Sequence, residues 1–178
     1  MKKLLGFSAS SSIYSINHNL LEYAVSLFEE NDVEIIKLTD YKAPFYSLEY
    51  EKENGIPDII KELREKIKKS EGLVIASPEY NGSITALLKN TIDWISRREK
   101  KILMDKPILL LSTSPGKGAG KGVSKYLYEI MPRWGGKIIT NFSLPEFDKN
   151  FDVKNKEIIT SEYKEELKER VQEFEEKL

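Results

Sequence analysis

The sequence contains no cysteine and a single histidine, His18. Without cysteine the chain cannot form disulfides, thiolate zinc sites or cysteine-ligated iron–sulfur clusters, and it has no cysteine nucleophile or redox thiol. With one histidine it also lacks the ligands of a multi-histidine metal centre. We therefore expect no metal site, and any redox chemistry would need a bound organic cofactor.

The chain also lacks an excess of charge of either sign. Its 178 residues include 28 Lys and Arg against 29 Asp and Glu, which gives a formal net charge of -1. This balance offers no basic field for nucleic acid or for an anionic membrane surface. No apolar run approaches the roughly 18 residues of a membrane-spanning helix, and the first one is too short for a signal-peptide core. We expect a cytoplasmic protein that binds neither nucleic acid nor membranes.

The sequence does contain enough hydrophobic residues for a core. Hydrophobic residues make up 40% of the chain, and a chain of this length can bury a substantial core. No internal repeat, low-complexity tract or linker-like stretch divides it. Residues 1–178 are therefore predicted to fold as a single domain.

Short apolar runs alternate with helical patterns, and each change falls at a cluster of Gly, Pro or Ser. The runs are rich in Val, Ile and Leu without polar alternation, as in parallel strands covered on both faces. Right-handed crossovers then predict an α/β fold with a doubly wound five-stranded sheet between two helical layers. The predicted strands are Lys3–Phe7, Val33–Leu38, Leu73–Ser77, Ile108–Ser112 and Lys137–Asn141. The predicted helices are Asn17–Glu29, Asp58–Lys69, Ile84–Ile95, Gly122–Met131 and Ser161–Leu178.

Ligands of such folds bind where the carboxyl ends of strands face the amino ends of helices. Three loops meet that description: Ser8–Asn17, Ser77–Ser83 and Ser112–Gly120. Two longer segments, Thr39–Ile56 and Leu144–Asn155, show no regular pattern and are expected to be loops that could cover a site.

The first of the three loops holds five serines between a buried strand and a helix start. Small hydroxyl side chains and free N–H groups at a helix N-terminus suit a phosphate, because the donors and the helix dipole both favour negative charge. The alternative is an ordinary capped turn with Ser15 or Asn17 as the N-cap. No G-x-G-x-x-G motif is present, which argues against a Rossmann-type site, and no G-x-x-x-x-G-K-[ST] motif indicates a P-loop.

The second loop and the helix after it carry a more specific pattern. Residues 78–83 read Pro-Glu-Tyr-Asn-Gly-Ser, and residues 88–94 read Leu-Lys-Asn-Thr-Ile-Asp-Trp. This pair resembles the signature of the NAD(P)H-dependent FMN reductases, a flavodoxin-like family that includes chromate, quinone and azo-dye reductases. Residues 10–17 resemble the family's Ser-x-Arg-x-x-Ser-x-Asn run, and residues 114–120 resemble its segment after the fourth strand. All three loops agree with the family in order and spacing.

The resemblance implies a flavodoxin-like three-layer sandwich with strand order 2-1-3-4-5, an FMN cofactor and NAD(P)H as co-substrate. The first loop would hold the phosphate, the second would lie along the isoalloxazine ring, and the third would border its far side. No side chain is expected to act as a catalyst, because the flavin itself carries the hydride chemistry. The implied FMN-binding residues are Ser10, Ser12, Ser15, Asn17, Pro78, Glu79, Tyr80, Asn81, Gly82, Ser114 and Gly116.

Two departures from the family pattern bear on these implications. Ser12 stands where the family usually has Arg, which removes a fixed positive charge from the phosphate site. Thr85 and Ala86 replace the usual Pro-Gly beside the ring, and the sequence does not predict the consequence.

By resemblance, the chain is an oxidoreductase that passes electrons from NAD(P)H through FMN to quinone, azo, nitro, chromate or free flavin acceptors, with ping-pong kinetics. The alternative is a flavodoxin-like electron carrier or flavin-binding module that does not turn over nicotinamide. A hydrolase using Ser10 or Ser15 with His18 is disfavoured, because the chain has no G-x-S-x-G nucleophile elbow.

The helix predicted over Ile84–Ile95 has apolar residues on more than one face. Such a helix is either deeply buried or meets another subunit. Because members of the resembled family generally pair through this region, we predict a homodimer or homotetramer that uses this helix and its Trp94. The aromatic residues of the long connection, Tyr41, Phe45, Tyr46 and Tyr50, are either core residues or a lid over the flavin.

Overall fold

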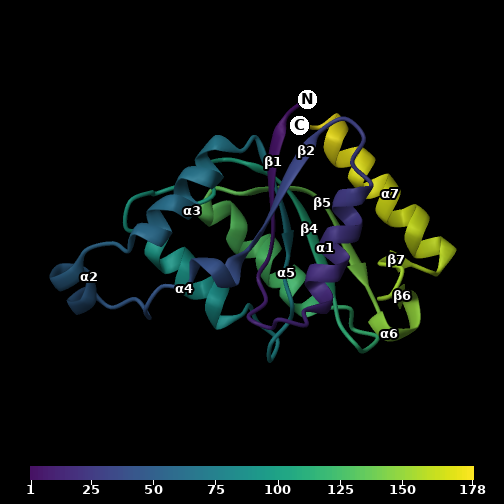
Figure 1. Ribbon diagram of the computed structural model, residues 1–178, viewed down its shortest axis with the longest axis horizontal. Helices are drawn as coiled ribbons and strands as arrows, with labels where there is room; N and C mark the ends of the chain where they lie inside the picture. The colour runs from purple at the N-terminus through teal and green to yellow at the C-terminus, as the bar shows by residue number, and fades with distance from the viewer.

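Five parallel strands form the central sheet of the computed structural model, which describes residues 1–178 (Figure 1). Their spatial order is β2-β1-β3-β4-β5, as predicted. Each predicted strand is present, and the largest difference is at the end of β5, which continues beyond the predicted Asn141. The strands are β1 (Lys3–Ser8), β2 (Asp32–Lys37), β3 (Gly72–Ala76), β4 (Pro107–Thr113) and β5 (Lys137–Leu144).

Helices cover both faces of the sheet because successive strand side chains alternate between two apolar clusters. Leu4, Val74 and Leu109 belong to the cluster that includes the helices α1 and α7. Their neighbours Leu5, Leu73 and Ile108 belong to the other cluster, with α3, α4 and α5. Both faces are buried, which explains the absence of polar alternation in the strands. The helices are α1 (Ile16–Ser26), α3 (Asp58–Lys69), α4 (Ala86–Ile95), α5 (Lys121–Ile130) and α7 (Ser161–Glu176).

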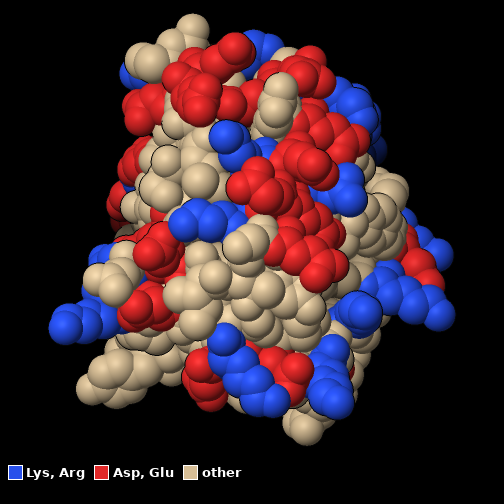
Figure 2. Space-filling view, turned by 90° about the vertical axis from the view of Figure 1, so that its right-hand side faces the viewer, with Lys and Arg blue, Asp and Glu red and all other residues tan.

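The closing helix α7 is one-sided. Leu167, Val171 and Phe174 are buried against the sheet and α1. Figure 2 looks onto the face on which α7 lies and shows side chains of both charge signs spread across it. The apolar stripe holds this helix on the sheet, while its charged face meets solvent.

The long connection after β2 is more ordered than expected. It contains a short 3-10 helix, η1 (Leu38–Tyr41), and the helix α2 (Leu48–Asn54), which stands out from the body of the protein (Figure 1). Ser47 caps α2 by accepting a hydrogen bond from Tyr50 N at 3.1 Å. The expectation of a loop over Thr39–Ile56 is therefore corrected. No residue of α2 is buried, so the helix has no apolar stripe from which it could have been predicted.

Trp94 is fully buried within its own chain, with 0% of its surface exposed. Its Nε1 donates to Pro44 O at 2.7 Å, and the rings of Tyr46 and Tyr50 stand edge-on to it at centroid distances of 5.1 and 5.8 Å. The second apolar face of α4 is thus covered by the long connection, and the predicted contact of Trp94 with another subunit is wrong.

The four aromatic residues of the connection divide between the two alternatives left open by the sequence. Tyr41 is buried in the core, and Tyr46 and Tyr50 pack against it. Phe45 is 80% exposed. Tyr41 is therefore a core residue, Tyr46 and Tyr50 are partly buried against the core, and Phe45 alone is exposed.

The segment Leu144–Asn155 also contains regular structure. It forms α6 (Phe147–Asn150) and β6 (Phe151–Asp152), which pairs with β7 (Glu157–Ile158) in a two-stranded sheet. Phe147 and Phe151 are buried and stack on each other with ring centroids 4.7 Å apart. The expectation of an irregular polar loop is wrong because these two rings anchor the segment to the core. A further 3-10 helix, η2 (Met131–Trp134), precedes β5.

None of the helices combines the length and the apolar character that a membrane crossing requires. No three His, Asp or Glu side chains come together in a way that could hold a metal ion.

Candidate functional site

The three candidate loops lie together at the carboxyl ends of β1, β3 and β4 (Figure 1). These ends are adjacent because the three strands are neighbours in the sheet and parallel. The site predicted from the sequence is therefore brought to one edge of the molecule.

In the first loop, three serine hydroxyls hold successive turns. Ser8 Oγ accepts from Ser10 N at 3.4 Å, Ser10 Oγ from Ser12 N at 3.1 Å, and Ser12 Oγ from Tyr14 N at 3.2 Å. Each bond runs from a hydroxyl to the amide two residues on, the pattern by which serine shapes a turn. The density of serines thus gives the loop a regular, tightly curled backbone.

The curled backbone leaves donors unused. The N–H groups of Ser11 and Ile13 have no acceptor within the chain. The helix α1 follows at once, and the N–H groups of its first turn have no acceptor in the helix. Ser15 caps this helix by accepting from His18 N at 3.2 Å, which confirms it as the N-cap. Capping uses one of the five serines, so it does not explain the others.

A hollow of about 80 Å³ opens beside these serines. Lys37, the last residue of β2, lies on its rim and pairs in register with Ser8 of β1. This positive charge was not predicted, although the parallel register of β1 and β2 could have revealed it. Ser11 does not border the hollow, whereas Ser12 does. The lining consists of Ser8, Ser10, Ser12, Ile13, Ser15, His18, Lys37, Leu38 and Thr39.

Asn17 is buried below the first loop, with 2% of its surface exposed. Its Nδ2 donates to Thr113 O at 3.1 Å, and its Oδ1 accepts from Thr113 N at 3.1 Å. The side chain therefore joins α1 to the end of β4. This contact gives Asn17 a positioning role, and a direct contact of Asn17 with a phosphate stays a prediction.

The second loop ends in a tight two-residue turn. Tyr80 N donates to Ser83 O at 2.9 Å and Ser83 N donates to Tyr80 O at 3.1 Å. Asn81 and Gly82 between them have φ values of 52° and 75°, as a type I′ turn requires. A Cβ at Gly82 would meet nothing within 4 Å, and the N–H groups of both residues have no acceptor within the chain. The tip is open and presents free donors.

Glu79 connects the second loop to the helix after the third. Its Oε2 accepts from Val123 N in the first turn of α5 at 2.9 Å. The N-cap position of that helix is Gly120, which has no side chain, so Glu79 supplies the missing acceptor. A Cβ at Gly122 would lie 2.8 Å from Glu79 Oε2, so a glycine is needed for this approach.

Thr85 connects the second loop to the first. Its hydroxyl donates to Ala9 O at 2.6 Å and accepts from Leu88 N at 3.1 Å. It is therefore the N-cap of α4, which begins at Ala86 rather than at the predicted Ile84. Thr85, which departs from the family pattern, thus caps α4 and bonds to the first loop. A proline could make neither contact, because it has no hydroxyl.

The third loop is held by the start of α6. Ser114 O accepts from Phe147 N at 3.1 Å, and Gly116 O accepts from Glu146 N at 3.0 Å. Ser114 Oγ also donates to Gly116 O at 3.0 Å. The loop then turns into α5 through Ala119 and Gly120, which have φ values of 54° and 72°.

The pattern at residues 88–94 has a structural role. Asn90 Oδ1 accepts from Tyr46 N at 2.9 Å, and its Nδ2 donates to Ala43 O at 3.2 Å and to Pro44 O at 3.1 Å. Together with Trp94 it fixes the long connection to α4. The residues of this pattern therefore hold the long connection in place, and the bonds of Asn90 and Trp94 are structural.

The predicted site residues differ in exposure. Ser10, Ser15, Asn17 and Pro78 are buried, and Glu79 and Ser114 are partly exposed. The remaining five are exposed: Ser12, Tyr80, Asn81, Gly82 and Gly116.

Comparison with known proteins agrees with this arrangement. The family described as NADPH-dependent FMN reductase matches residues 2–149. A quinone reductase of Escherichia coli K12 is 38% identical over 88 residues, which cover 49% of this chain and 47% of that protein, so the match spans about half the length of this relative. An NAD(P)H-dependent FMN reductase of Pseudomonas aeruginosa is 35% identical over 121 residues, 65% of this chain and 61% of that protein.

Among solved structures, the flavoenzyme NAD(P)H:(acceptor) oxidoreductase FerB of Paracoccus denitrificans is similar with a TM-score of 0.78 and 23% identity. The similarity covers 98% of this chain and 95% of that one. At this identity the likeness concerns the fold.

Proposed function

The chain belongs to the NADPH-dependent FMN reductase family, and we propose that it is an FMN-dependent oxidoreductase. It takes electrons from NAD(P)H and delivers them to a small acceptor such as a quinone, an azo or nitro compound, chromate or free flavin. The names of two relatives, a quinone reductase and an FMN reductase, support the acceptor class and the cofactor. The observation that carries the proposal is the serine-lined hollow beside an open turn with free N–H donors, at the carboxyl edge of the sheet.

The residues of the first loop fit the phosphate end of FMN. The hydroxyls of Ser10, Ser12 and Ser15 border the hollow, and the free N–H groups beside them are suited to a phosphate at a helix N-terminus. Lys37 on the rim supplies a positive charge that Ser12 does not. The donor set of the loop therefore matches a dianionic group.

The second and third loops fit the ring end. Pro78, Glu79 and Tyr80 lead to the open turn, where the free N–H groups of Asn81 and Gly82 would donate to the polar edge of the ring as negative charge develops there. Ser114 and Gly116 would border its far side. When bound, FMN supplies the hydride and electron transfer, and the chain supplies placement and donors.

The proposal is tested with purified protein reconstituted with FMN. We expect an oxidised flavin spectrum that NAD(P)H bleaches without oxygen and that a quinone restores. Because electron donor and acceptor would use one open face in turn, double-reciprocal plots should be parallel; intersecting lines would contradict a shared face.

Two results would overturn the proposal in different ways. Failure to bind FMN at micromolar concentration would refute the site itself. Tight FMN binding without NAD(P)H oxidation would instead indicate an electron carrier or a flavin-binding module.

We also propose that the protein assembles as a homodimer or homotetramer. Large apolar side chains are exposed, including Ile13 at 85% and Tyr14 at 86% in the first loop and Phe45 at 80% in the long connection. Exposed apolar groups of this kind favour association. Sedimentation as a single chain at micromolar concentration would refute the proposal. A cytoplasmic location and a single domain over residues 1–178 stay predictions.

A further inference from the structure

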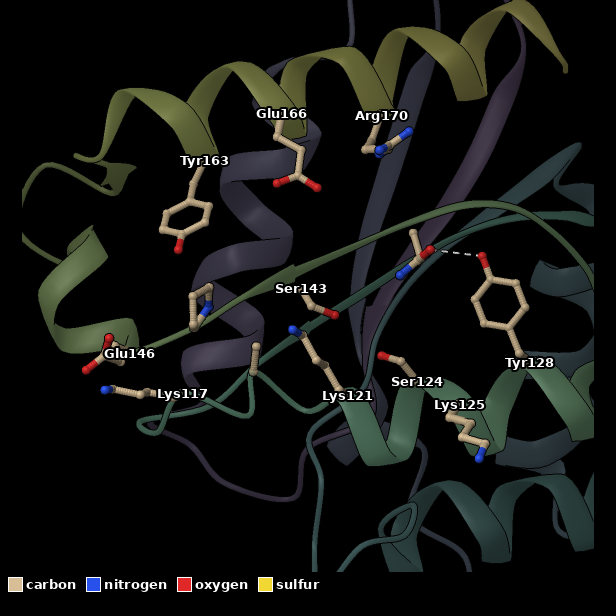
Figure 3. Close-up of a pocket in the computed structure, with 13 residues that line it drawn as sticks. Lys117, Lys121, Ser124, Lys125, Tyr128, Ser143, Glu146, Tyr163, Glu166 and Arg170 are labelled. Atoms are coloured by element: carbon tan, nitrogen blue, oxygen red, sulfur yellow. Dashed lines mark hydrogen bonds between the residues drawn. The ribbon is translucent and has the colours of Figure 1, made fainter.

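A second hollow lies along the edge strand β5, between α5 and α7 (Figure 3). Its volume is about 720 Å³, much larger than the serine hollow. None of the eleven residues predicted to bind FMN borders it. We call it the β5 groove, and nothing in the proposed flavin chemistry accounts for it.

The floor of the β5 groove presents hydrogen-bond acceptors. Ser112 Oγ donates to Ala119 O at 2.7 Å and also contacts Ser124 Oγ at 3.1 Å and Ser143 Oγ at 2.9 Å. A hydroxyl has one proton, so Ser124 and Ser143 must be the donors in their bonds to Ser112. Both border the groove, and both therefore turn lone pairs toward it.

The two walls carry unpaired charges of opposite sign. Glu146 and Arg170 of the lining are ion-paired, with Lys149 at 2.6 Å and Glu173 at 3.3 Å. Three lysines of the lining, Lys117, Lys121 and Lys125, and the carboxylate of Glu166 have no ion-pair partner. Lys117 lies beside Glu146 and Lys125 points away from the strand, so Lys121 is the lysine directed into the groove (Figure 3). Figure 3 shows Lys121 reaching up from α5 and Glu166 reaching down from α7 toward the strand between them.

Helix stability does not explain the position of Lys121. It is the first residue of α5, where a positive charge opposes the helix dipole. One end of the groove adds a donor. Tyr128 OH donates to Asn141 Oδ1 at 2.9 Å, which leaves the Nδ2 hydrogens of Asn141 free. Burial raises the pKa of Tyr128, so its hydroxyl keeps the proton that holds Asn141 in this orientation.

These groups are matched by one kind of ligand. A simple anion would meet the lone pairs of Ser124 and Ser143 and the carboxylate of Glu166, which repel it. A neutral polyol would leave Lys121 without a partner. We propose that the β5 groove binds a phosphorylated sugar, with the phosphate on Lys121 and the sugar hydroxyls donating to Glu166 and the two serines. The ligand is either a free sugar phosphate or the ribose phosphate of a nucleotide.

The test is calorimetric titration of the protein saturated with FMN, so that the flavin site is occupied. The probes are ribose 5-phosphate, inorganic phosphate and AMP. We expect ribose 5-phosphate to bind at least tenfold more tightly than inorganic phosphate. AMP binding tenfold more tightly again would identify a nucleotide as the source, and equal or weaker AMP binding would identify a sugar phosphate.

Three variants locate the site. Lys121→Ala should weaken the binding of ribose 5-phosphate at least tenfold. Glu166→Ala should also weaken the binding of ribose 5-phosphate. The affinity of this variant for inorganic phosphate should be unchanged or higher, because the substitution removes a repulsive charge. The matched control is Lys154→Ala, an exposed lysine outside the groove, and it should bind as the wild type.

The proposal is overturned if ribose 5-phosphate and AMP both fail to bind at millimolar concentration. It is also overturned if inorganic phosphate binds as tightly as ribose 5-phosphate, or if Lys121→Ala and Glu166→Ala both bind like the control. Melting temperatures of the three variants, all at surface positions, show whether each remains folded.

Discussion

Asn17 binds both backbone polar groups of Thr113, donating to its carbonyl oxygen and accepting from its N–H, each at 3.1 Å. This pair of bonds joins the start of α1 to the end of β4, across two of the three loops of the candidate site. The relative placement of those loops is therefore set by the chain itself before any ligand binds.

Two further contacts complete the connection among the loops. Thr85 joins the second loop to Ala9 of the first, and Glu79 joins it to Val123 after the third. Each uses a side chain of one loop to bind a backbone group of another. Such cross-links reduce the ordering cost that ligand binding would otherwise impose.

Replacing Asn17 should destabilise the fold. Asn17→Ala leaves the buried N–H and carbonyl of Thr113 without partners, and we expect a loss of about 2–4 kcal/mol in the free energy of unfolding. Urea denaturation measures this. Asn19→Ala, on the same helix but without a side-chain hydrogen bond, is the control and should change stability by about 0.5 kcal/mol or less. Equal losses at both positions would contradict the role of the Thr113 contact.

The hydroxyl of Thr85 is predicted to matter more than its shape. Thr85→Val keeps the volume but removes both the cap of α4 and the bond to Ala9, so unfolding should become easier by about 1–3 kcal/mol. Thr85→Ser keeps the hydroxyl and should retain most of the stability. Denaturation of the two variants side by side checks this, and a serine variant as unstable as the valine one would show that packing dominates.

Trp94 should affect folding rather than assembly. Trp94→Ala empties a fully buried site and removes the bond to Pro44, and we expect a loss of about 3–5 kcal/mol. Trp94→Phe keeps an aromatic ring and should lose less. Sedimentation of the folded phenylalanine variant should match the wild type. Dissociation of that variant without loss of stability would return Trp94 to a subunit interface.

Much of the fold could be predicted because its three central strands, β1, β3 and β4, are buried on both faces. A run such as Leu73–Ser77 is too short for a helix and has no polar alternation, and the helical patterns that separate such runs indicate an α/β fold. The order of the strands came from the family resemblance of the loops, and the structure confirms it. The helix α2 could not be predicted, because it buries no residue and so leaves no periodic pattern.

The site was predictable in its loops but not in the contacts between them. The serines and the Asn81–Gly82 turn are local signals, because turn chemistry depends on neighbouring residues. Lys37 reaches the hollow through strand pairing, and Trp94 is covered by a segment about 50 residues earlier in the chain. Contacts between distant segments depend on the tertiary structure, which a local pattern does not contain.

Lys37 is predicted to contribute to FMN binding through its charge. A charge-assisted hydrogen bond contributes about 1.5–3 kcal/mol, so Lys37→Ala should weaken FMN binding by about tenfold or more. Fluorescence titration of FMN measures the dissociation constant. Lys42→Ala removes an exposed lysine that does not border the hollow, and it should have little effect. Similar weakening by both would indicate a general effect of net charge.

Ser12 is the position at which an added charge should strengthen the same site. It borders the hollow, and an arginine there could form charge-assisted, bidentate bonds to a phosphate, whereas serine offers one neutral donor. Ser12→Arg should therefore tighten FMN binding about tenfold or more and make that binding more sensitive to salt. Ser12→Asp should abolish binding through charge repulsion. FMN titrations at two salt concentrations test both changes.

The neighbouring serine and the lysine on the rim provide the controls for this prediction. Ser11 is exposed but does not border the hollow, so Ser11→Arg should change FMN affinity much less than Ser12→Arg. Because the arginine would supply the charge that Lys37 otherwise provides, Ser12→Arg should restore FMN binding in the Lys37→Ala background. An effect at Ser11 instead of Ser12 would mean that the family alignment is off by one residue. If neither position affects FMN binding, the phosphate does not lie in this loop.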